Sequence, residues 1–503
     1  MKFLEILAAD RLPRWFWPLL LGLNLAMHLP FFQLPPTSVH TWRQCNTMAV
    51  ARNLYEEGMN PLKPRVDRRK DTDGVTGMQF PSYEWVVAGS YRVLGFNETW
   101  PRVISWLMMA AGLVAFYALV RRISGSALLG ALGAWGLSWS PEIYFHGINA
   151  LPDILALTAS TAGLWWFVRW RDTRQPLLLF LSLLGVTLGG LTKLQFLVVG
   201  FPIAVFVVRD ILQRRLSLAA LGLLLGYALV AVGLPLAWYA YALKLIESSG
   251  LNDFGLELRP ASDFITGLNI FKRNLLSDWP ELLLGYGMVV LLLVGLWRLL
   301  RRPPLRHEWF LPGLAWSLAL AAYYFIELRQ MEGHTYYQLP LLPPLLLLGV
   351  WGAAWLRRYP RGRVLLLVAL VSLPLWAFLR VNVGRWMKPL TEPIELTDPA
   401  NRLALETATP PEALCVVGPD ISGCKYFYFL HKKGFGFDWP SQLVESSSNG
   451  KLYVADCIDR GARYLYTNDS TTINDVRLRP YLDRQVRRVG SFQVWALRPA
   501  PAN

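Results

Sequence analysis

The chain of 503 residues is unusually apolar: 53% of its residues are hydrophobic and only 17% are charged, against about a quarter in a typical soluble domain. This composition excludes a soluble enzyme, a disordered protein and a nucleic-acid-binding domain, although the formal net charge is +15. The 22 Trp, 20 Tyr and 24 Phe residues are typical of a protein with many membrane interfaces, where aromatic rings collect.

Long apolar runs indicate membrane-spanning helices, because a hydrocarbon core of about 30 Å requires about 20 residues of α-helix. We expect an all-α polytopic membrane protein with about eleven transmembrane helices by that criterion. The longest run is divided at Thr192 and Lys193, since a lysine at mid-membrane is costly. The expected spans cover residues 15–34, 103–122, 127–143, 150–170, 176–192, 194–209, 217–243, 281–300, 309–327, 337–357 and 363–383.

The positions of Lys and Arg predict how these spans are oriented. With a cytoplasmic N-terminus, basic residues such as Arg121, Arg302 and Arg358 all lie inside, whereas the short outer loops hold only Lys193 and Arg329. The positive charge is therefore a topology signal and not a binding site for a polyanion. We expect a multi-pass protein of the bacterial inner membrane, divided into a transmembrane domain over 1–383 and an extracytoplasmic domain over 384–503.

The first outer loop, 35–102, holds the most informative polar pattern. Residues 40–58 are compatible with a helix ending at Gly58, and at about 100° per residue His40, Arg43 and Gln44 share one face. This could be a solvated face of a surface helix; we favour a face lining a cleft, because these side chains make specific hydrogen bonds. The stretch 79–96 is amphipathic and too short to span, and is expected to lie along the membrane interface.

Other polar groups lie at the outer ends of the expected spans. Asp153 follows Pro152 at a helix start, where it either complements the helix dipole or faces an outer cavity. Lys193 either extends to the headgroups or contacts a lipid phosphate. His334 and Tyr337 precede another span, where tyrosine is common at interfaces but could also bind a sugar.

The tail 384–503 has no spanning run and predicts a small soluble α/β domain. Strands are expected at 414–418 and 463–468, a helix at 422–432, and two further strands within 485–498. Its cysteines are Cys415, Cys424 and Cys457, so at most one pair can form within this domain, and the pattern does not indicate which.

Several motifs are absent from the sequence. It contains no Gly-x-x-x-x-Gly-Lys-Ser/Thr motif for nucleotide phosphates and no Cys/His spacing typical of zinc. Asp67, Asp71 and Asp73 could form a metal site, but they alternate with Arg and Lys, so we expect no metal and no other cofactor.

Five local motifs, in this order and all at outer helix ends, carry a resemblance to a known family. They are His-Thr-Trp-Arg-Gln with Ala-Arg-Asn-Leu-Tyr-Glu-Glu-Gly within 40–58, Phe-Pro-Ser-Tyr at 80–83, Leu-Pro-Asp at 151–153, Leu-Thr-Lys at 191–193 and His-Thr-Tyr-Tyr-Gln-Leu-Pro-Leu-Leu-Pro-Pro at 334–344. Over about residues 10–385 the chain resembles the GT-C superfamily of membrane glycosyltransferases. More narrowly, it resembles the group of protein O-mannosyltransferases and aminoarabinose–lipid A transferases, which is similar to glycosyltransferase family 39.

The resemblance implies an integral-membrane glycosyltransferase. Such an enzyme moves a sugar from a polyprenyl-phosphate-linked donor to an extracytoplasmic lipid, glycan or protein acceptor, in a single inverting displacement. The roles it implies are Glu84 or Asp153 as base or acceptor-orienting acid, Arg43, Lys193 and His334 as contacts to the donor phosphate, and His40, Gln44, Asn46, Gln79, Tyr83 and Tyr337 as sugar or acceptor contacts.

The chain departs from the family pattern at two positions. Family members usually place an acid in the first helix of this loop, where this chain has Arg43-Gln44-Cys45-Asn46, and a second acid where it has Gln79. Two alternatives therefore stay open: a non-catalytic lipid-glycan binding or assembly protein of the same fold, and a secondary transporter. A transporter would show repeated halves and charges at the bilayer midplane, whereas the charges here lie at outer helix ends.

Overall fold

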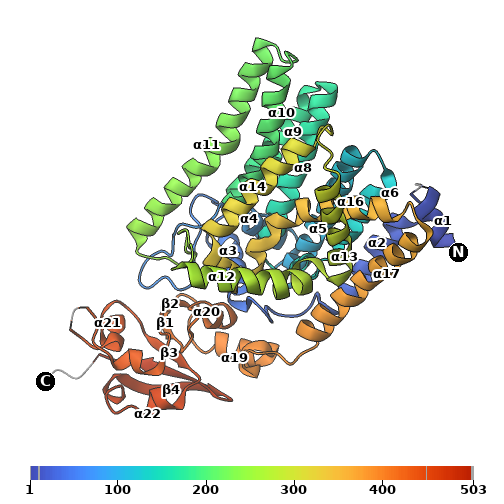
Figure 1. Ribbon diagram of the computed structural model, residues 1–503. Helices are drawn as coiled ribbons and strands as arrows, with labels where there is room; N and C mark the ends of the chain where they lie inside the picture. Colours follow the sequence, from blue (N-terminus) through green and yellow to red (C-terminus); the bar gives the residue numbers. More distant parts are fainter. Residues whose placement is uncertain (1, 10–11, 449, 500–503) are drawn as a thin grey trace. The chain divides into compact units, whose positions relative to one another are not determined.

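The computed structural model describes residues 2–9, 12–448 and 450–499. It is mostly helical, with a five-stranded sheet near the C-terminus, as Figure 1 shows. The chain divides into two compact units. The first unit comprises Met1–Gln33, Thr99–Trp238 and Leu256–Lys388, and the second comprises Leu34–Glu98, Tyr239–Gly255 and Pro389–Asn503.

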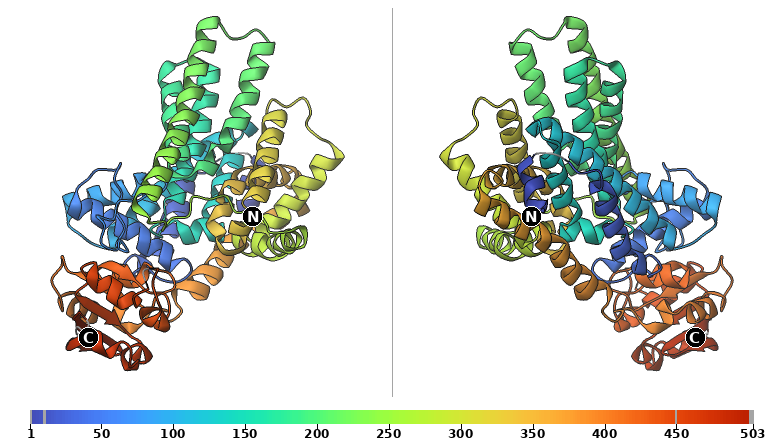
Figure 2. Two further views of the ribbon diagram at one scale, coloured as in Figure 1. Left: turned by 90° about the vertical axis from the view of Figure 1, so that its left-hand side faces the viewer. Right: turned by 90° about the vertical axis from the view of Figure 1, so that its right-hand side faces the viewer.

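The first unit is built from helices, which Figure 2 shows from two sides; α9 and α10 run in nearly the same direction, whereas α12 and α17 are inclined to them. Those that lie in this unit or begin in it, with η for 3-10 or π-helical segments, are α1 (Lys2–Ala9), α2 (Phe16–His28), η1 (Leu29–Phe31), α5 (Thr99–Ser124), α6 (Ala127–Ser138), α7 (Pro141–His146), α8 (Asp153–Thr173), α9 (Pro176–Thr192), η2 (Leu194–Val199), α10 (Gly200–Leu212), α11 (Leu218–Ser249), α12 (Phe264–Arg273), η3 (Asn274–Leu284), α13 (Tyr286–Arg301), α14 (Phe310–Ile326), α15 (Leu328–Gly333), η4 (Thr335–Leu341), α16 (Leu342–Leu356), α17 (Pro360–Ala377) and η5 (Phe378–Trp386).

The eleven spans expected from the sequence are not confirmed. By length and composition, five helices among the described residues could cross a membrane: α5, η2 with α10, α11, η4 with α16, and α17 with η5. A sixth results if η3 and α13, bent by 116° at their junction, form one span. The other apolar runs fold as shorter helices, and α8 carries four charged residues, Asp153, Arg169, Arg171 and Asp172.

Small residues bring α8 and α9 into close contact. A Cβ added at Gly185 would lie 2.7 Å from the carbonyl oxygen of Ala159 and 2.9 Å from the Cα of Gly163. Small side chains allow membrane helices to approach this closely, so that backbone packs on backbone. The pair therefore forms a closely packed hairpin that places the start of α8 beside the end of α9.

At the opposite end of α8, charged side chains join several helices. Arg122 of α5 binds Asp172 at 2.6 Å and Glu308 at 2.9 Å, and Arg171 of α8 binds Asp210 of α10 at 2.8 Å. Arg171 also lies 3.2 Å from Glu308. Because both arginines share Glu308, this network ties the ends of α5, α8 and α10 together.

The second unit contains an α/β sheet of strand order β2-β1-β3-β5-β4, with β1 parallel to β2 and β3 and the remaining pairs antiparallel. The expected strands and helix of the tail are confirmed, whereas β2 was not predicted because Lys433–Gly436 is short and glycine-rich. The elements of this unit are α3 (Thr41–Glu57), α4 (Ser82–Leu94), α18 (Ile394–Thr397), α19 (Pro399–Glu406), β1 (Leu414–Val417), α20 (Lys425–Leu430), β2 (Lys433–Gly436), η6 (Pro440–Val444), α21 (Tyr453–Asp459), β3 (Tyr464–Thr467), α22 (Ser470–Asn474), η7 (Arg479–Tyr481), β4 (Leu482–Val489) and β5 (Phe492–Leu497).

The first outer loop packs against the C-terminal domain within this unit. The backbone N–H of Lys70 donates to Gly434 at 2.8 Å, and that of Gly434 donates to Asp67 at 3.1 Å, which covers the open edge of the sheet at β2. The guanidinium of Arg52 on α3 bridges the Asp67 carboxylate (2.7 Å) and the carbonyl of Tyr428 (3.1 Å). Loop and domain are thus one folded body.

Candidate active site

The first unit brings two of the predicted site residues together. Asp153 is the first residue of α8, and Lys193 follows the last residue of α9. The Lys193 ammonium lies 3.7 Å from the Asp153 carboxylate, and both side chains are buried. A buried cation and anion are tolerated when they pair, so the α8–α9 hairpin holds a charge pair at one end.

Two tyrosines of η4 also lie close to this lysine. The Lys193 ammonium lies 5.4 Å from the ring centroid of Tyr336 and 5.1 Å from that of Tyr337. The negative face of an aromatic ring attracts a cation, which fixes the ammonium further. The ring of His334 lies 5.6 Å from that of Tyr336 and 6.0 Å from that of Tyr337, so His334 belongs to the same group.

A buried carboxylate that the sequence analysis did not single out lies next to this group. Glu142 of α7 accepts hydrogen bonds from Arg385 at 3.1 Å and from Thr335 at 2.8 Å. Its carboxylate also lies 2.9 Å from Nε2 of His146, whose ring packs against Tyr336 with centroids 5.9 Å apart. The spacing of Glu142 and His146, four residues apart on a helix, was the available signal.

We call this group of the first unit the polar cluster. It contains two carboxylates, two basic side chains and several aromatic rings, all from helix ends. Such a set can hold an anionic group and orient a hydroxyl-bearing one. Its members are Glu142, His146, Asp153, Lys193, His334, Thr335, Tyr336, Tyr337 and Arg385.

The second unit holds the other predicted residues, on α3, α4 and the segment before α4. Gln79 donates to the buried carboxylate of Glu84 at 3.4 Å, and Tyr83 is buried beside Glu84 in the chain. Gln44 donates to the carbonyl of Thr37 at 3.0 Å. The guanidinium of Arg43 lies 4.9 Å from the ring centroid of Phe254.

The helix α3 differs from the expected surface helix. His40 occupies the N-cap position in the left-handed region with φ 61°, and His40, Arg43, Gln44 and Asn46 are all buried. Every residue from Arg43 to Leu54 is buried, because the C-terminal domain and the segment near Phe254 cover the helix. The solvated-face interpretation is therefore wrong.

The aspartates weighed as metal ligands make other contacts. Asp67 pairs with Arg52, Asp71 pairs with Arg460, and Asp73 accepts a hydrogen bond from the backbone of Val75. Within the part of the chain that the structure describes, no group of three or more His, Cys, Asp or Glu side chains could hold a metal ion. The four cysteines are buried free thiols.

Comparison with known proteins shows which sequences and structures this chain is similar to. Residues 79–239 match the family model of dolichyl-phosphate-mannose-protein mannosyltransferases. The structure matches ArnT from Cupriavidus metallidurans, solved bound to undecaprenyl phosphate, with a TM-score of 0.61 and 15% sequence identity over 96% of this chain and 98% of that chain. No curated protein sequence matches the chain.

Two further solved structures share the fold. One is the oligosaccharyltransferase of Archaeoglobus fulgidus tethered with an acceptor peptide, with a TM-score of 0.57 and 10% identity over 90% of this chain and 69% of that one. The other is the arabinofuranosyltransferase AftD from Mycobacteria, with a TM-score of 0.58 and 15% identity over 98% of this chain and 40% of that one.

These matches define the class: the chain is a multi-pass membrane protein with the fold of the GT-C superfamily. More narrowly, residues 79–239 are similar to dolichyl-phosphate-mannose-protein mannosyltransferases and the whole fold is similar to that of ArnT, which confirms the resemblance noted in the sequence.

Proposed function

We propose that this protein is an integral-membrane glycosyltransferase that takes a sugar from a polyprenyl-phosphate-linked donor and attaches it to an extracytoplasmic lipid, glycan or protein. The observation that carries this proposal is the buried Lys193, held between Asp153 and two tyrosine rings in a GT-C fold. The structurally similar ArnT and the Archaeoglobus fulgidus oligosaccharyltransferase AglB were solved with undecaprenyl phosphate and with a dolichol-phosphate, respectively, which supports a lipid-phosphate donor.

The reaction follows from the charge that develops in it. A hydroxyl oxygen of the acceptor attacks the anomeric carbon, and the bond from that carbon to the phosphate oxygen breaks with its electron pair on the phosphate. The leaving phosphate gains negative charge, which a preplaced ammonium stabilises more strongly than it stabilises the ground state. Lys193 is assigned this role, and Asp153 orients its ammonium.

A base accepts the proton of the attacking hydroxyl. Glu84, to which Gln79 donates, and Asp153 are the two candidates from the sequence, and the structure adds Glu142. Glu142 already binds Arg385, Thr335 and His146, which suits a positioning residue for the start of η4 and its tyrosines. Glu84 is therefore the first candidate for the base, and Asp153, which pairs with Lys193, is retained as the alternative base or as an acceptor-orienting acid.

The remaining assignments concern binding and location. Arg43 and His334 are proposed as further contacts to the donor phosphate, and His40, Gln44, Asn46, Gln79, Tyr83 and Tyr337 as contacts to the sugar or acceptor. We place the protein in the bacterial inner membrane with a cytoplasmic N-terminus and an extracytoplasmic C-terminal domain, because its loop charges follow the positive-inside rule.

The test is transfer by the purified protein in lipid nanodiscs, supplied with undecaprenyl-phosphate-linked pentoses and hexoses carrying a radiolabel and with a membrane extract as acceptor. Labelled acceptor should form with the unmodified protein and with Lys244→Gln, a control at an exposed lysine on α11. It should form about 10²- to 10³-fold more slowly with Lys193→Gln.

The non-catalytic alternative is favoured by one observation: the stretch Arg43-Gln44-Cys45-Asn46 has no carboxylate and Gln79 is an amide, whereas the family resemblance implies an acid at each place. In that case the purified protein would retain donor lipid, detected by mass spectrometry, yet transfer nothing from any of the supplied donors. Such a result would overturn the transferase proposal while leaving lipid binding intact.

A further inference from the structure

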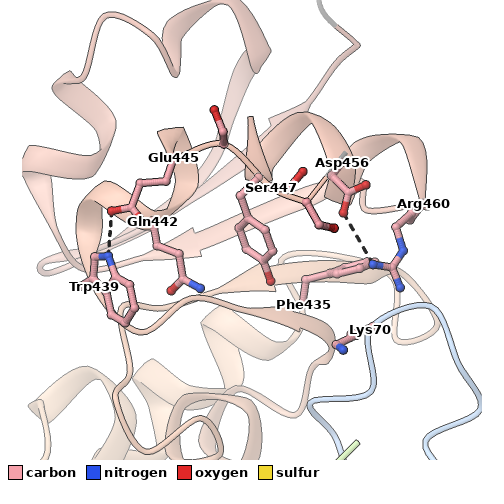
Figure 3. A pocket seen from close by; sticks show the side chains of 11 residues that line it. Lys70, Phe435, Trp439, Gln442, Glu445, Ser447, Asp456 and Arg460 are labelled. Atoms are coloured by element: carbon pink, nitrogen blue, oxygen red, sulfur yellow. Dashed lines mark hydrogen bonds and ion pairs between the residues drawn. The ribbon is translucent and has the colours of Figure 1, made fainter. Parts of the chain in front are cut away.

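A cleft of about 360 Å³ lies in the second unit beside the edge strand β2. Its size falls within the range of about 300–1,000 Å³ typical of small-ligand sites. Figure 3 shows the side chains of Trp439 and Gln442 on one side of it and those of Asp456 and Arg460 on the other. Lys70 of the first outer loop contributes to the rim, so the cleft is formed by two segments far apart in sequence.

The fold holds the aromatic wall in a defined orientation. Nε1 of Trp439 donates to the Glu445 carboxylate at 2.9 Å, and Ser441 donates to the same oxygen at 2.6 Å. The polar edge of the indole is thereby satisfied, although 48% of the residue is exposed. A large exposed indole in a charged cleft is a surface that a ligand ring can cover.

The polar side chains around this indole are also fixed. The backbone N–H of Asp438 donates to Oε1 of Gln442 at 2.6 Å, which directs the amide nitrogen away from the backbone. Nε of Arg460 donates to Asp71 at 3.1 Å, and its Nη1 lies 3.6 Å from Asp456. Side chains that are already held in place lose little conformational entropy when a ligand binds to them.

The charges of the cleft indicate which ligand it suits. Lys70 and Arg460 are positive and Glu445 and Asp456 are negative, so the formal charges cancel, and the guanidinium already has two carboxylate partners. An ionic ligand would find no excess of opposite charge. A ligand with an apolar face and a rim of hydroxyl groups would match the indole and the surrounding donors and acceptors.

We propose that this cleft is a binding site for a neutral saccharide, stacked on Trp439 and hydrogen-bonded by Gln442, Glu445 and Asp456. The site shares no residue with the polar cluster or with the predicted donor and acceptor contacts. It goes beyond the proposed transfer reaction, since it needs neither a lipid donor nor catalysis. Binding at this cleft would hold a glycan chain at the C-terminal domain.

Binding is measured on the full-length protein in nanodiscs by saturation-transfer NMR and calorimetry. The probes are maltotetraose, cellotetraose, mannotetraose and chitotetraose, with tetragalacturonate as the charged comparison. At least one neutral probe should bind with a Kd below about 5 mM, and Trp439→Ala should weaken it about tenfold or more. Gln442→Ala should weaken it less.

Two controls separate binding from folding. Trp439→Phe keeps an aromatic face and should retain most of the affinity. Trp85→Ala removes a similarly exposed indole from α4, where 45% of the residue is exposed, and should leave binding unchanged. The proposal is overturned if no neutral probe binds, if Trp439→Ala binds as tightly as the unmodified protein, or if only tetragalacturonate binds.

Discussion

The ammonium of Lys193 lies 3.7 Å from the carboxylate of Asp153, at the junction where α9 ends and α8 begins. Separating the two groups would cost free energy, because both are buried and each neutralises the charge of the other. The close contact of α8 and α9 fixes the position of the Lys193 ammonium, so the packing of these helices bears directly on the proposed reaction.

The first prediction concerns this pair in the reaction. Lys193→Gln should lower the rate of transfer by about 10²- to 10³-fold, as expected when one group that stabilises a developing anion is lost. Asp153→Asn should lower it as well, because the ammonium loses its orienting partner. Single-turnover transfer in nanodiscs measures both. Unchanged turnover in both variants would contradict the assignment of the phosphate contact.

The second prediction concerns the buried pair of Glu142 and Arg385. Removing one partner leaves an uncompensated buried charge, which costs about 3–5 kcal/mol. Glu142→Gln should therefore lower the thermal unfolding temperature in detergent markedly. The double variant Glu142→Gln with Arg385→Met should recover much of the loss, because no charge then remains unpaired. Equal stability of the single and double variants would show that the pair does not act as a unit.

The third prediction concerns pH. Burial lowers the pKa of His431, but hydrogen bonds from its ring to Glu406 at 2.6 Å and to Glu56 at 3.2 Å, opposed by nearby Arg52, leave the pKa above its usual value. A group whose pKa is raised on folding contributes stability below its unfolded value of about 6.5, and this contribution is lost as pH rises through the folded value.

Hydrogen exchange of α20 and the end of α3, compared between about pH 6 and pH 8.5, measures this loss. Protection in the unmodified protein should fall over that window, beyond the chemical increase in exchange rate. In His431→Gln this excess fall should disappear, whereas the control His307→Gln, in the segment before α14, should keep it. An identical excess in His431→Gln would assign the pH dependence to other groups.

The fourth prediction concerns the α8–α9 hairpin. Gly185→Leu places a side chain where the backbone of Ala159 and Gly163 lies, and overpacking of this kind costs about 1–3 kcal/mol or more. It should lower the unfolding temperature and also the transfer rate, because Asp153 and Lys193 are displaced. Gly222→Leu is the matched control on α11, since nothing lies within 4 Å of the added Cβ there. Equal effects of the two variants would argue against close packing.

The fifth prediction tests orientation. The native cysteines are buried, so they give little background with an impermeant thiol reagent. A cysteine in place of Asp73, which is exposed in the first outer loop, should react in intact cells, and one in place of Arg302 should react only after lysis. The opposite labelling pattern would reverse the proposed topology and remove the extracytoplasmic assignment of the C-terminal domain.

Local patterns were sufficient for much of this protein. Apolar runs indicated helices, and α11 and α17 lie where such runs were expected, because hydrophobicity along a helix is a property of consecutive residues. The strands β1, β3 and β5 were expected because short apolar runs bounded by turn residues are also a property of consecutive residues. Asp153, Lys193 and Tyr337 were singled out because polar groups at helix ends stand out against an apolar sequence.

The tertiary structure decided how these residues meet. Lys193 and Tyr336 approach each other only because η4 packs beside the α8–α9 hairpin, and Arg385 reaches Glu142 across 243 residues of chain. The bend at Gly285, with φ 74°, and the glycine contacts of α8 and α9 likewise depend on packing and not on hydropathy. Charge pairing and close packing join residues distant in sequence, and no local periodicity encodes them.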